Sequence, residues 1–255
     1  MRALRSYGLL IRWQTLRLQA FLVLAIVVQV AFAFGIVVGY PLLFPEIDEM
    51  TVLFLATGAP AITLITMGLV ALPQVVAQSR MEGSLDYMRS LPVPRLVFLM
   101  ADLTVMLAIV LPGVVFAVAV GSWALDLALS ISWTIIPAVL LVATTSAAIG
   151  YAMASVLPPM MAMLLTQVLV IGVLVFSPIN FPASRLPDWM QAIHEVLPVQ
   201  AMGEVIRGSL AADTFSLSAG PFVLLTGWCA VSLGLSYLTL RRRVLAGSDP
   251  VASTP

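Results

Sequence analysis

The sequence predicts an all-α membrane protein with six transmembrane helices, and three observations lead to this prediction. Of the 255 residues, 61% are hydrophobic and only 9% are charged, whereas a soluble domain has about 45–50% apolar and about 25% charged residues. Six stretches are apolar enough to cross the hydrocarbon core, which takes about 20 residues of helix. The arginines gather in the segments on one side of these stretches, as the positive-inside rule requires.

The six predicted spans follow one another with short connections, and prolines mark several ends or kinks. A proline inside a span indicates a kink, because neighbouring groups can satisfy the carbonyl that it frees. Pro158 and Pro159 instead force a tight break between the fourth span and the fifth. The predicted spans are Ala20–Tyr40, Val52–Ala77, Leu96–Val120, Ile131–Leu157, Met160–Phe176 and Pro221–Leu240.

The distribution of charge predicts the orientation. With six spans, ten of the 12 basic residues precede the first span, lie between the second and third, or follow the sixth. These three segments lie on the same side of the membrane, and most acidic residues lie on the other. The positive-inside rule therefore predicts a multi-pass protein of the plasma (inner) membrane, with the N- and C-termini in the cytoplasm.

Residues 1–19 predict an N-terminal amphipathic helix that lies in the cytoplasmic interface. Apolar side chains on one face oppose arginines on the other. These residues are Leu4, Tyr7, Ile11 and Leu18 against Arg5 and Arg12. The alternative is a positively charged leader that only sets the orientation. The transmembrane domain then covers residues 20–240, and residues 241–255 form a cytoplasmic C-terminal tail.

The segment between the second and third spans predicts a short cytoplasmic helix at about residues 79–91. Its beginning, Ser79-Arg80-Met81-Glu82, has the capping-box pattern that starts a helix. Apolar side chains then recur at helical spacing at Met81, Leu85 and Met88, and two prolines end the pattern. Such a stripe fits a groove of a partner protein. It could equally rest on the membrane surface.

The segment between the fifth and sixth spans predicts an outer helical hairpin at about residues 185–212. Two amphipathic patterns, Pro187–Leu197 and Val199–Leu210, meet at Pro198. Each is too short to cross the bilayer, so a re-entrant hairpin in the outer leaflet fits. His194 would lie on the polar side, where a proton relay is one interpretation and plain surface is the one we favour.

Residue types that are missing exclude several classes of function. The sequence contains no lysine, so it cannot build the Gly-Lys-Ser/Thr of a phosphate-binding P-loop. Its single histidine excludes a His-Glu-x-x-His metal site. It also shows no chain of intramembrane carboxylates and no internal repeat of spans, which many ion-coupled carriers have. We therefore expect neither an enzyme nor a metal-binding protein.

Polar residues inside the spans are few, and burying them is costly. Asp102, near the cytoplasmic end of the third span, is expected to pair with a cytoplasmic arginine; a role in transport is the alternative. Gln29 and Gln167 are expected to hydrogen-bond between helices. The threonines of the second span are expected to bond to their own backbone; they are Thr57, Thr63 and Thr66.

Two stretches resemble the membrane subunit of ABC-2 type exporters. The stretch SRMEGSLDYMRSLPVPRLVF is similar to that family's cytoplasmic segment, and FPASRLPDWMQAIHEVLPVQAMGEVIRGSL is similar to its outer hairpin. The order of these motifs among six spans completes the resemblance. The chain departs from the family pattern at Leu197, where an asparagine usually precedes the hinge proline.

The resemblance implies a permease subunit that pairs with a second copy or paralogue and with a separate cytoplasmic ABC ATPase. ATP and Mg would be bound by that ATPase, and this chain would bind no cofactor and no nucleic acid. The expected substrate is a hydrophobic or amphipathic drug, antibiotic or lipid, because the pathway spans have few aromatics for stacking sugars. The alternative is an ATPase-independent secondary transporter or channel.

The resemblance also implies three groups of site residues, none of them catalytic or metal-binding. The expected ATPase-coupling residues are Met81, Glu82, Gly83, Leu85, Asp86, Met88 and Arg89. The expected residues of the outer hairpin or gate are Pro187, Trp189, His194, Pro198, Glu204 and Arg207. The residues expected to line the pathway, on spans one, two and five, are Gln29, Thr63, Met67, Met163 and Gln167.

Overall fold

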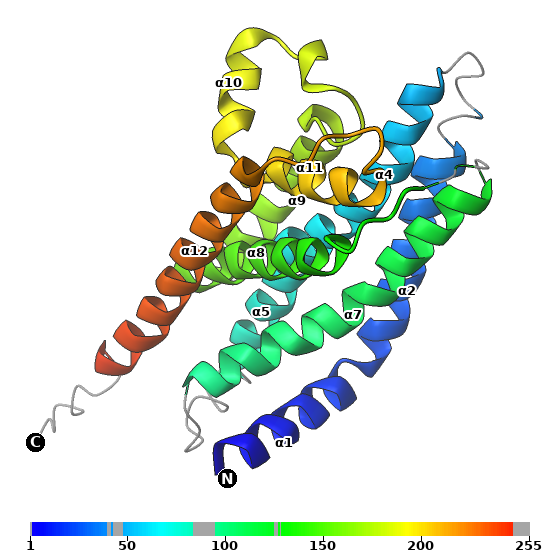
Figure 1. The fold of residues 1–255 in the computed structure, drawn as a ribbon. Coiled ribbons are helices and arrows are strands. Elements are labelled where there is room, and N and C mark those ends of the chain that lie inside the picture. The colour runs from blue at the N-terminus through cyan, green and yellow to red at the C-terminus, as the bar shows by residue number, and fades with distance from the viewer. Residues whose placement is uncertain are drawn as a thin grey trace, which may run out of the picture.

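The computed structural model describes residues 2–39, 42, 48–83, 95–124, 127 and 129–246, and every regular element among them is helical (Figure 1). The predicted all-α class is therefore confirmed. The elements are α1 (Arg2–Arg17), α2 (Gln19–Phe34), η1 (Gly35–Gly39), α4 (Glu49–Thr66), η2 (Met67–Ala71), α5 (Leu72–Met81), α7 (Arg95–Ala124), α8 (Ile135–Val156), α9 (Pro159–Phe176), η3 (Ala183–Arg185), α10 (Asp188–Val196), α11 (Pro198–Leu210) and α12 (Ala219–Ala246).

Helices occupy each of the six predicted spans. In the described part of the chain, five are long and apolar enough to cross a membrane: Glu49–Met81, Met100–Ala124, Ile135–Val156, Pro159–Phe176 and Ala219–Thr239. The first predicted span corresponds to α2 and η1, whose described apolar part is Val23–Gly39. The fold thus contains about five candidate membrane helices, and the count of six stays a prediction.

The segment formed by α4, η2 and α5 runs through the middle of the bundle. It packs against α8 along its length, against α7 at α4 and η2, against α9 near α5, and against α11 near α4. α7 also contacts α1 and α2, and α8 packs against α12. In Figure 1, α10 and α11 lie at one end of the bundle, while α1 and the last turns of α12 lie at the other.

Local chemistry explains where several helices begin and break. α4 begins after Asp48, whose carboxylate accepts hydrogen bonds from the Thr51 N–H (3.2 Å) and hydroxyl (2.6 Å), a good N-cap arrangement. α8 ends at Val156, and α9 begins at Pro159. The two consecutive prolines cannot continue the helix of α8, but the second suits the first turn of α9. The predicted break is confirmed.

Small residues bring the backbones of η2 and α8 into direct contact. A Cβ atom added at Gly68 would overlap Ser146, and one added at Gly150 would overlap the carbonyl of Gly68. Close approach through glycine and serine is the usual way in which membrane helices pack. The Ser146 hydroxyl also donates to the carbonyl of Leu64 (3.3 Å). This contact holds α8 against the central segment.

α1 lies along α7 through the face that the apolar pattern predicts. The Tyr7 hydroxyl contacts the Thr104 hydroxyl at 2.6 Å, and Leu10 packs on Ala101 with Tyr7 and Ile11 around it. Gln14 follows on the same face and donates from Nε2 to Asp102 Oδ1 (2.5 Å).

Asp102 interacts electrostatically with Arg17 of α1, in line with the predicted arginine partner, but its hydrogen bond comes from Gln14. Among the described residues, the side chain that contacts the carboxylate of Asp102 is Gln14. Helical spacing places Gln14 toward α7, because it lies one turn after Leu10 and two turns after Tyr7. Three of the other polar predictions are confirmed, and those for Gln167 and Thr66 stay predictions. Gln29 Nε2 donates to the Ile109 carbonyl of α7 (3.4 Å). Thr57 and Thr63 donate to carbonyls of their own helix.

The segment that is predicted to form the outer hairpin contains two helices with a break between them, and its outer location stays a prediction. α10 covers Asp188–Val196, α11 begins at Pro198, and Leu197 between them is extended. The orientation of α10 differs from the expectation for His194, which is buried and not at the surface. The apolar face of α10, including Trp189 (63% exposed), points outward. An outward apolar face is stable in a bilayer, because lipid tails are as apolar as the protein core.

Candidate functional site

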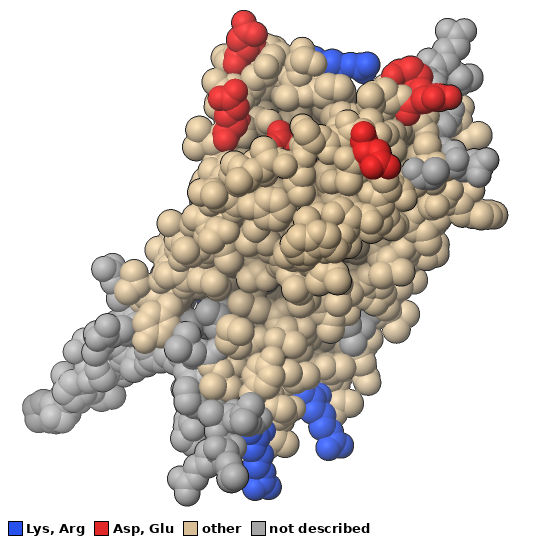
Figure 2. Space-filling view, in the orientation of Figure 1, with Lys and Arg blue, Asp and Glu red and all other residues tan. Residues whose placement is uncertain are grey.

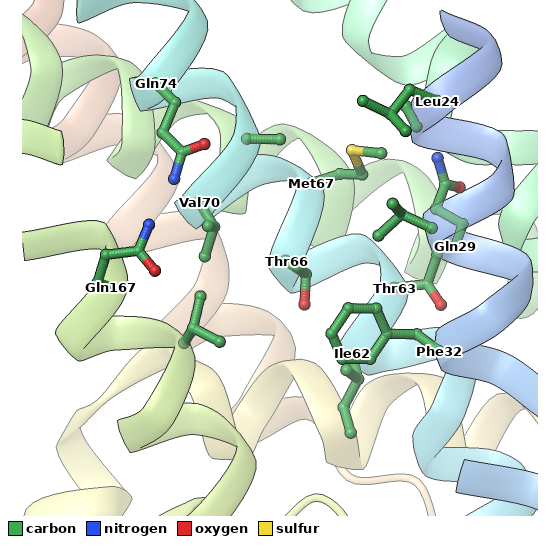
Figure 3. Close-up of a pocket in the computed structure, with 14 residues that line it drawn as sticks. Leu24, Gln29, Phe32, Ile62, Thr63, Thr66, Met67, Val70, Gln74 and Gln167 are labelled. Atoms are coloured by element: carbon green, nitrogen blue, oxygen red, sulfur yellow. The ribbon is translucent and has the colours of Figure 1, made fainter. Parts of the chain in front are cut away.

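A cavity of about 290 Å³ lies between α2, the central segment and α9 (Figure 3). Its volume is close to the lower end of the range for small-molecule sites, about 300–1,000 Å³. Its walls are mainly apolar, and none of its lining residues carries a charge. The residues that line it include Leu24, Gln29 and Phe32 of α2, Ile62, Thr63 and Thr66 of α4, Met67 and Val70 of η2, Gln74 of α5, and Gln167 and Val170 of α9.

The polar groups of this cavity are amides and hydroxyls. Gln29 uses its amide nitrogen on α7, and its buried Oε1 has no hydrogen-bond partner in the described structure. Gln74 donates to the Thr166 hydroxyl at 3.1 Å. In Figure 3 the side chains of Gln74 and Gln167 point toward one another from α5 and α9. The cavity therefore offers neutral hydrogen-bonding groups on an apolar surface.

The irregular helix beside the cavity has a local cause. Pro73 has no N–H to donate to Leu69, and its ring clashes with the carbonyl four residues earlier. The chain just before it, Met67–Ala71, is a π-helix, which widens the turn; such turns are frequent at functional sites. Three residues of this π-helix, Met67, Val70 and Ala71, line the cavity.

The structure brings together four of the five residues predicted to line a pathway. Gln29, Thr63, Met67 and Gln167 line the cavity, and Met163 does not. Their role in transport stays a prediction. The sequence reasoning missed Gln74, although it could have been found by continuing the stripe of helical spacing that runs from Thr63 through Met67.

At the other end of α5, the helix continues through the residues that were expected to start a new one. Ser79 and Met81 belong to α5, and the Ser79 hydroxyl donates to the carbonyl of Val75 (2.8 Å). The capping-box interpretation is therefore wrong at Ser79. The helix ends two residues before Gly83, whose φ of 71° is a conformation that glycine adopts readily.

Arg80 and Arg17 fix this end of α5 in place. Arg80 donates to the carbonyls of Ala154 and Leu157 (2.5 and 2.6 Å), where α8 ends. Arg17 of α1 donates to the Ser79 hydroxyl (2.8 Å), and its guanidinium lies 3.6 Å from the carboxylate of Glu82. The end of α5 is thus tied to both α1 and α8.

The expected coupling residues fall partly on the described chain. Met81 and Glu82 are exposed, and Gly83 ends the described segment. The remaining ones, Leu85, Asp86, Met88 and Arg89, lie outside the described residues.

The residues predicted for the outer hairpin occupy two different environments. Pro187 directly precedes α10, Trp189 is exposed, and Pro198 is the first residue of α11. Glu204 is half-buried, and its carboxylate accepts a hydrogen bond from Gln200 (2.7 Å). Arg207, next to it on α11, is buried. The predicted group is thus not one polar surface.

Arg207 joins three segments of the chain. Its Nη2 donates to the Ile179 carbonyl (2.5 Å), and its guanidinium carbon lies 3.5 Å from the ring centroid of Phe54 and 5.6 Å from that of Phe215. Burial lowers the pKa of Arg207 to about 10, and Glu204 opposes this shift. The guanidinium therefore stays charged at neutral pH, held by aromatic faces.

His194 lies on the buried face of α10, in an apolar environment. It lines a cavity of about 380 Å³ together with Phe176, Leu197 and Trp228. Its buried Nδ1 has no hydrogen-bond partner in the described structure. Burial lowers the pKa of His194, and a hydrogen bond with the backbone of Phe176 partly opposes the shift. The imidazole is therefore neutral at neutral pH.

The comparison with known families decides the class of the protein. The family model of the ABC-2 type transporter matches residues 2–211, which include α1, the cavity and the outer hairpin. The chain belongs to the ABC-2 type transporter family. The resemblance seen in the sequence is thus confirmed. No curated protein matches the sequence significantly.

Membership of this family has direct consequences for the function. ABC-2 membrane domains are transport subunits and are not themselves ATPases. The chain is therefore a transporter permease subunit, and its apolar helices make it a multi-pass membrane protein. Permeases of this family typically work with an ATPase partner. Among the described residues, no group of histidine, cysteine and acidic side chains could hold a metal ion.

Proposed function

We propose that this permease subunit belongs to an ATP-driven exporter, which moves a hydrophobic or amphipathic drug, antibiotic or lipid out of the cell. The observation that carries the proposal is the continuity of the central segment. The same helical run lines the cavity at Met67 and Gln74 and ends at Met81, the first of the expected coupling residues. A movement at one end of this segment would reach the cavity at the other.

The chemistry of the cavity supports the proposed substrate class. Its apolar wall suits the body of an amphipathic molecule, while Gln74 and Gln167 can bind a neutral polar group. A charged group would find no opposite charge among the lining residues and would be costly to bury. The proposed substrate is therefore an amphipathic molecule whose buried part is uncharged.

The proposed orientation has six spans and places both termini in the cytoplasm. Figure 2 shows the acidic side chains gathered toward the end where α10 and α11 lie, and the basic ones mainly toward the opposite end. The positive-inside rule assigns the basic end to the cytoplasm. α10 and α11 then lie outside, and the end of α5 faces the cytoplasm.

The proposed energy source is a separate ATPase that binds ATP and Mg. Two copies of this subunit, or this chain and a paralogue, would pair in the membrane with two ATPase subunits. The segment after Met81 would dock into the ATPase, and closure of the ATPase pair would move α5. The π-helix Met67–Ala71 would then absorb the movement of α5 by a change in its backbone conformation, because its turn is already irregular.

The Leu85→Asp substitution tests this proposal. Burying a large apolar side chain contributes roughly 1.5–3 kcal/mol, so a carboxylate at this position should weaken ATPase docking about tenfold or more. We expect membrane insertion and dimerisation to stay normal, while co-purification of the ATPase and efflux of a dye substrate are lost.

Glu82→Gln is the matched control at the same end of α5. Its exposed carboxylate faces Arg17 at 3.6 Å, and such surface pairs contribute only about 0–1 kcal/mol. We expect this variant to have a smaller effect than Leu85→Asp on co-purification of the ATPase and on efflux. Normal ATPase recovery with Leu85→Asp, together with transport that follows an ion gradient, would favour a secondary transporter or channel.

A further inference from the structure

A second cavity, which the transport proposal does not use, lies between α11 and the start of α12. Its volume is about 320 Å³, and α11 contributes Glu204 and Arg207 to its lining. The loop that leads to α12 contributes the hydroxyls of Thr214, Ser216 and Ser218. Because α12 begins a candidate membrane span at Ala219, this cavity lies at the boundary between hydrocarbon and water.

Two independent features of this cavity favour an anion. Arg207 is only 4% exposed, and its Nε has no hydrogen-bond partner in the described structure. The N-terminus of α12 lies beside it, and the first turn of α12 contains no acidic residue. Free backbone N–H groups and the helix dipole make such an end an oxyanion site. A buried cation and a helix N-terminus thus meet in one cavity.

The hydroxyl groups of the lining are available to a ligand. Thr214, Ser216 and Ser218 are exposed, and within the described part of the chain their side chains make no hydrogen bond. Hydroxyl groups donate readily to phosphate oxygens. They would complete the set of donors that Arg207 begins.

Glu204 adds a negative charge to the cavity, and this charge would not stabilise a bound anion. It lies one turn before Arg207 and lines the same cavity, yet no ion pair within 4.0 Å joins the two side chains in the described structure. The cavity therefore holds a cation and a carboxylate that do not neutralise each other by contact. A ligand with separated positive and negative charges matches this arrangement.

We propose that this cavity binds the headgroup of a zwitterionic phospholipid of the phosphatidylethanolamine type. The phosphate lies against Arg207 and the start of α12, and the ammonium lies against Glu204. The acyl chains follow the outer face of α12, where Val223 and Val231 are 71% and 67% exposed. This site concerns binding by the chain alone, so it does not rest on the transport proposal.

Lipid binding to the purified full chain tests the proposal. The chain is held in a sugar-headed detergent that carries no phosphate, and bound lipid is measured by native mass spectrometry. The probes are phosphatidylethanolamine, phosphatidylglycerol and diacylglycerol with the same acyl chains, together with glycerophosphoethanolamine. We expect phosphatidylethanolamine to bind at least about tenfold more tightly than the other three, since charge-assisted hydrogen bonds fix its headgroup.

The Ser218→Asp variant places a carboxylate where the phosphate would lie. Aspartate is favourable just before a helix, so α12 should fold as before, while binding of phosphatidylethanolamine weakens about tenfold. Ser184→Asp is the matched control, because it adds the same charge at an exposed serine of η3 outside the cavity. The control should bind as the unchanged chain does.

Glu204→Gln tests the ammonium half of the site and should remove the preference for phosphatidylethanolamine over phosphatidylglycerol. Equal binding by the Ser218→Asp and Ser184→Asp variants would overturn the location of the site. Diacylglycerol that binds as well as phosphatidylethanolamine would overturn the role of the phosphate. Equally tight binding of glycerophosphoethanolamine would overturn the assignment to a lipid.

Discussion

α10 and α11 follow one another in the chain and both have amphipathic sequences, yet they occupy opposite environments. α10 exposes its large apolar side chains, including Trp189, Ile193 and Val196. α11 buries nearly all of its residues, and even the charged Arg207 is only 4% exposed. α11 packs against α4, α8 and α12, whereas the main helix neighbour of α10 is α11 itself.

The difference shows what an amphipathic pattern means in a membrane protein. The pattern indicates that a helix has one apolar and one polar face. It does not decide which face is buried, because an apolar face that points outward is stable in the bilayer. The face toward the protein can then be the polar one, if its groups find partners. Arg207 finds the Ile179 carbonyl and the Phe54 ring, and His194 finds the backbone of Phe176.

The largest expected effect comes from removing the charged group of α11. Arg207→Ala leaves the Ile179 carbonyl without its donor and removes the stacking on Phe54, so the free energy of unfolding should fall by about 2–4 kcal/mol. Unfolding of the purified chain in detergent measures it. Arg185→Ala is the matched control in η3, where the exposed arginine should contribute less than about 0.5 kcal/mol. Equal losses from both variants would contradict the structural role of Arg207.

A smaller effect on the free energy of unfolding is expected when one methyl group is removed from a side chain of each helix. Ile206 of α11 is fully buried, and Ile193 of α10 is 49% exposed. Ile206→Val should lower the free energy of unfolding by about 1 kcal/mol, because it leaves a small cavity in a packed site. Ile193→Val should change it very little. If the two variants unfolded alike, the contrast between the helices would be wrong.

The smallest effect concerns the pH dependence of stability around His194. Burial lowers the pKa of His194 in the folded state, so protonation costs more there than in the unfolded chain, and stability falls as the pH drops through about 6.5. We expect the stability difference between the unchanged chain and His194→Gln to shrink from about pH 7.5 to about pH 5.5. Thermal unfolding of both proteins across this range measures the effect. A difference that is constant with pH would mean that His194 is accessible to water.

Sequence reasoning succeeded where the signal is local. The bounds of the helix Pro159–Phe176 and the break before it were predicted to within a residue. Proline restricts the backbone of its immediate neighbours, so its effect can be predicted from the local sequence. The hinge at Pro198 was predicted for the same reason. At Ser79 the local pattern was misleading. Ser79-x-x-Glu82 can begin a helix, but contacts of Arg80 with the end of α8 favour the continuation of α5.

The sequence by itself determined the helical class, the apolar segments, the hairpin helices and the family, because these depend on composition and on motifs that are contiguous in the chain. Only the tertiary structure decided which polar side chains contact one another. Gln14 meets Asp102 across 88 positions of sequence, and Gln74 meets Thr166 across 92. Such pairs follow from how helices pack, and packing is set by the shapes of many side chains together. No single local sequence pattern therefore predicts which helices pack together.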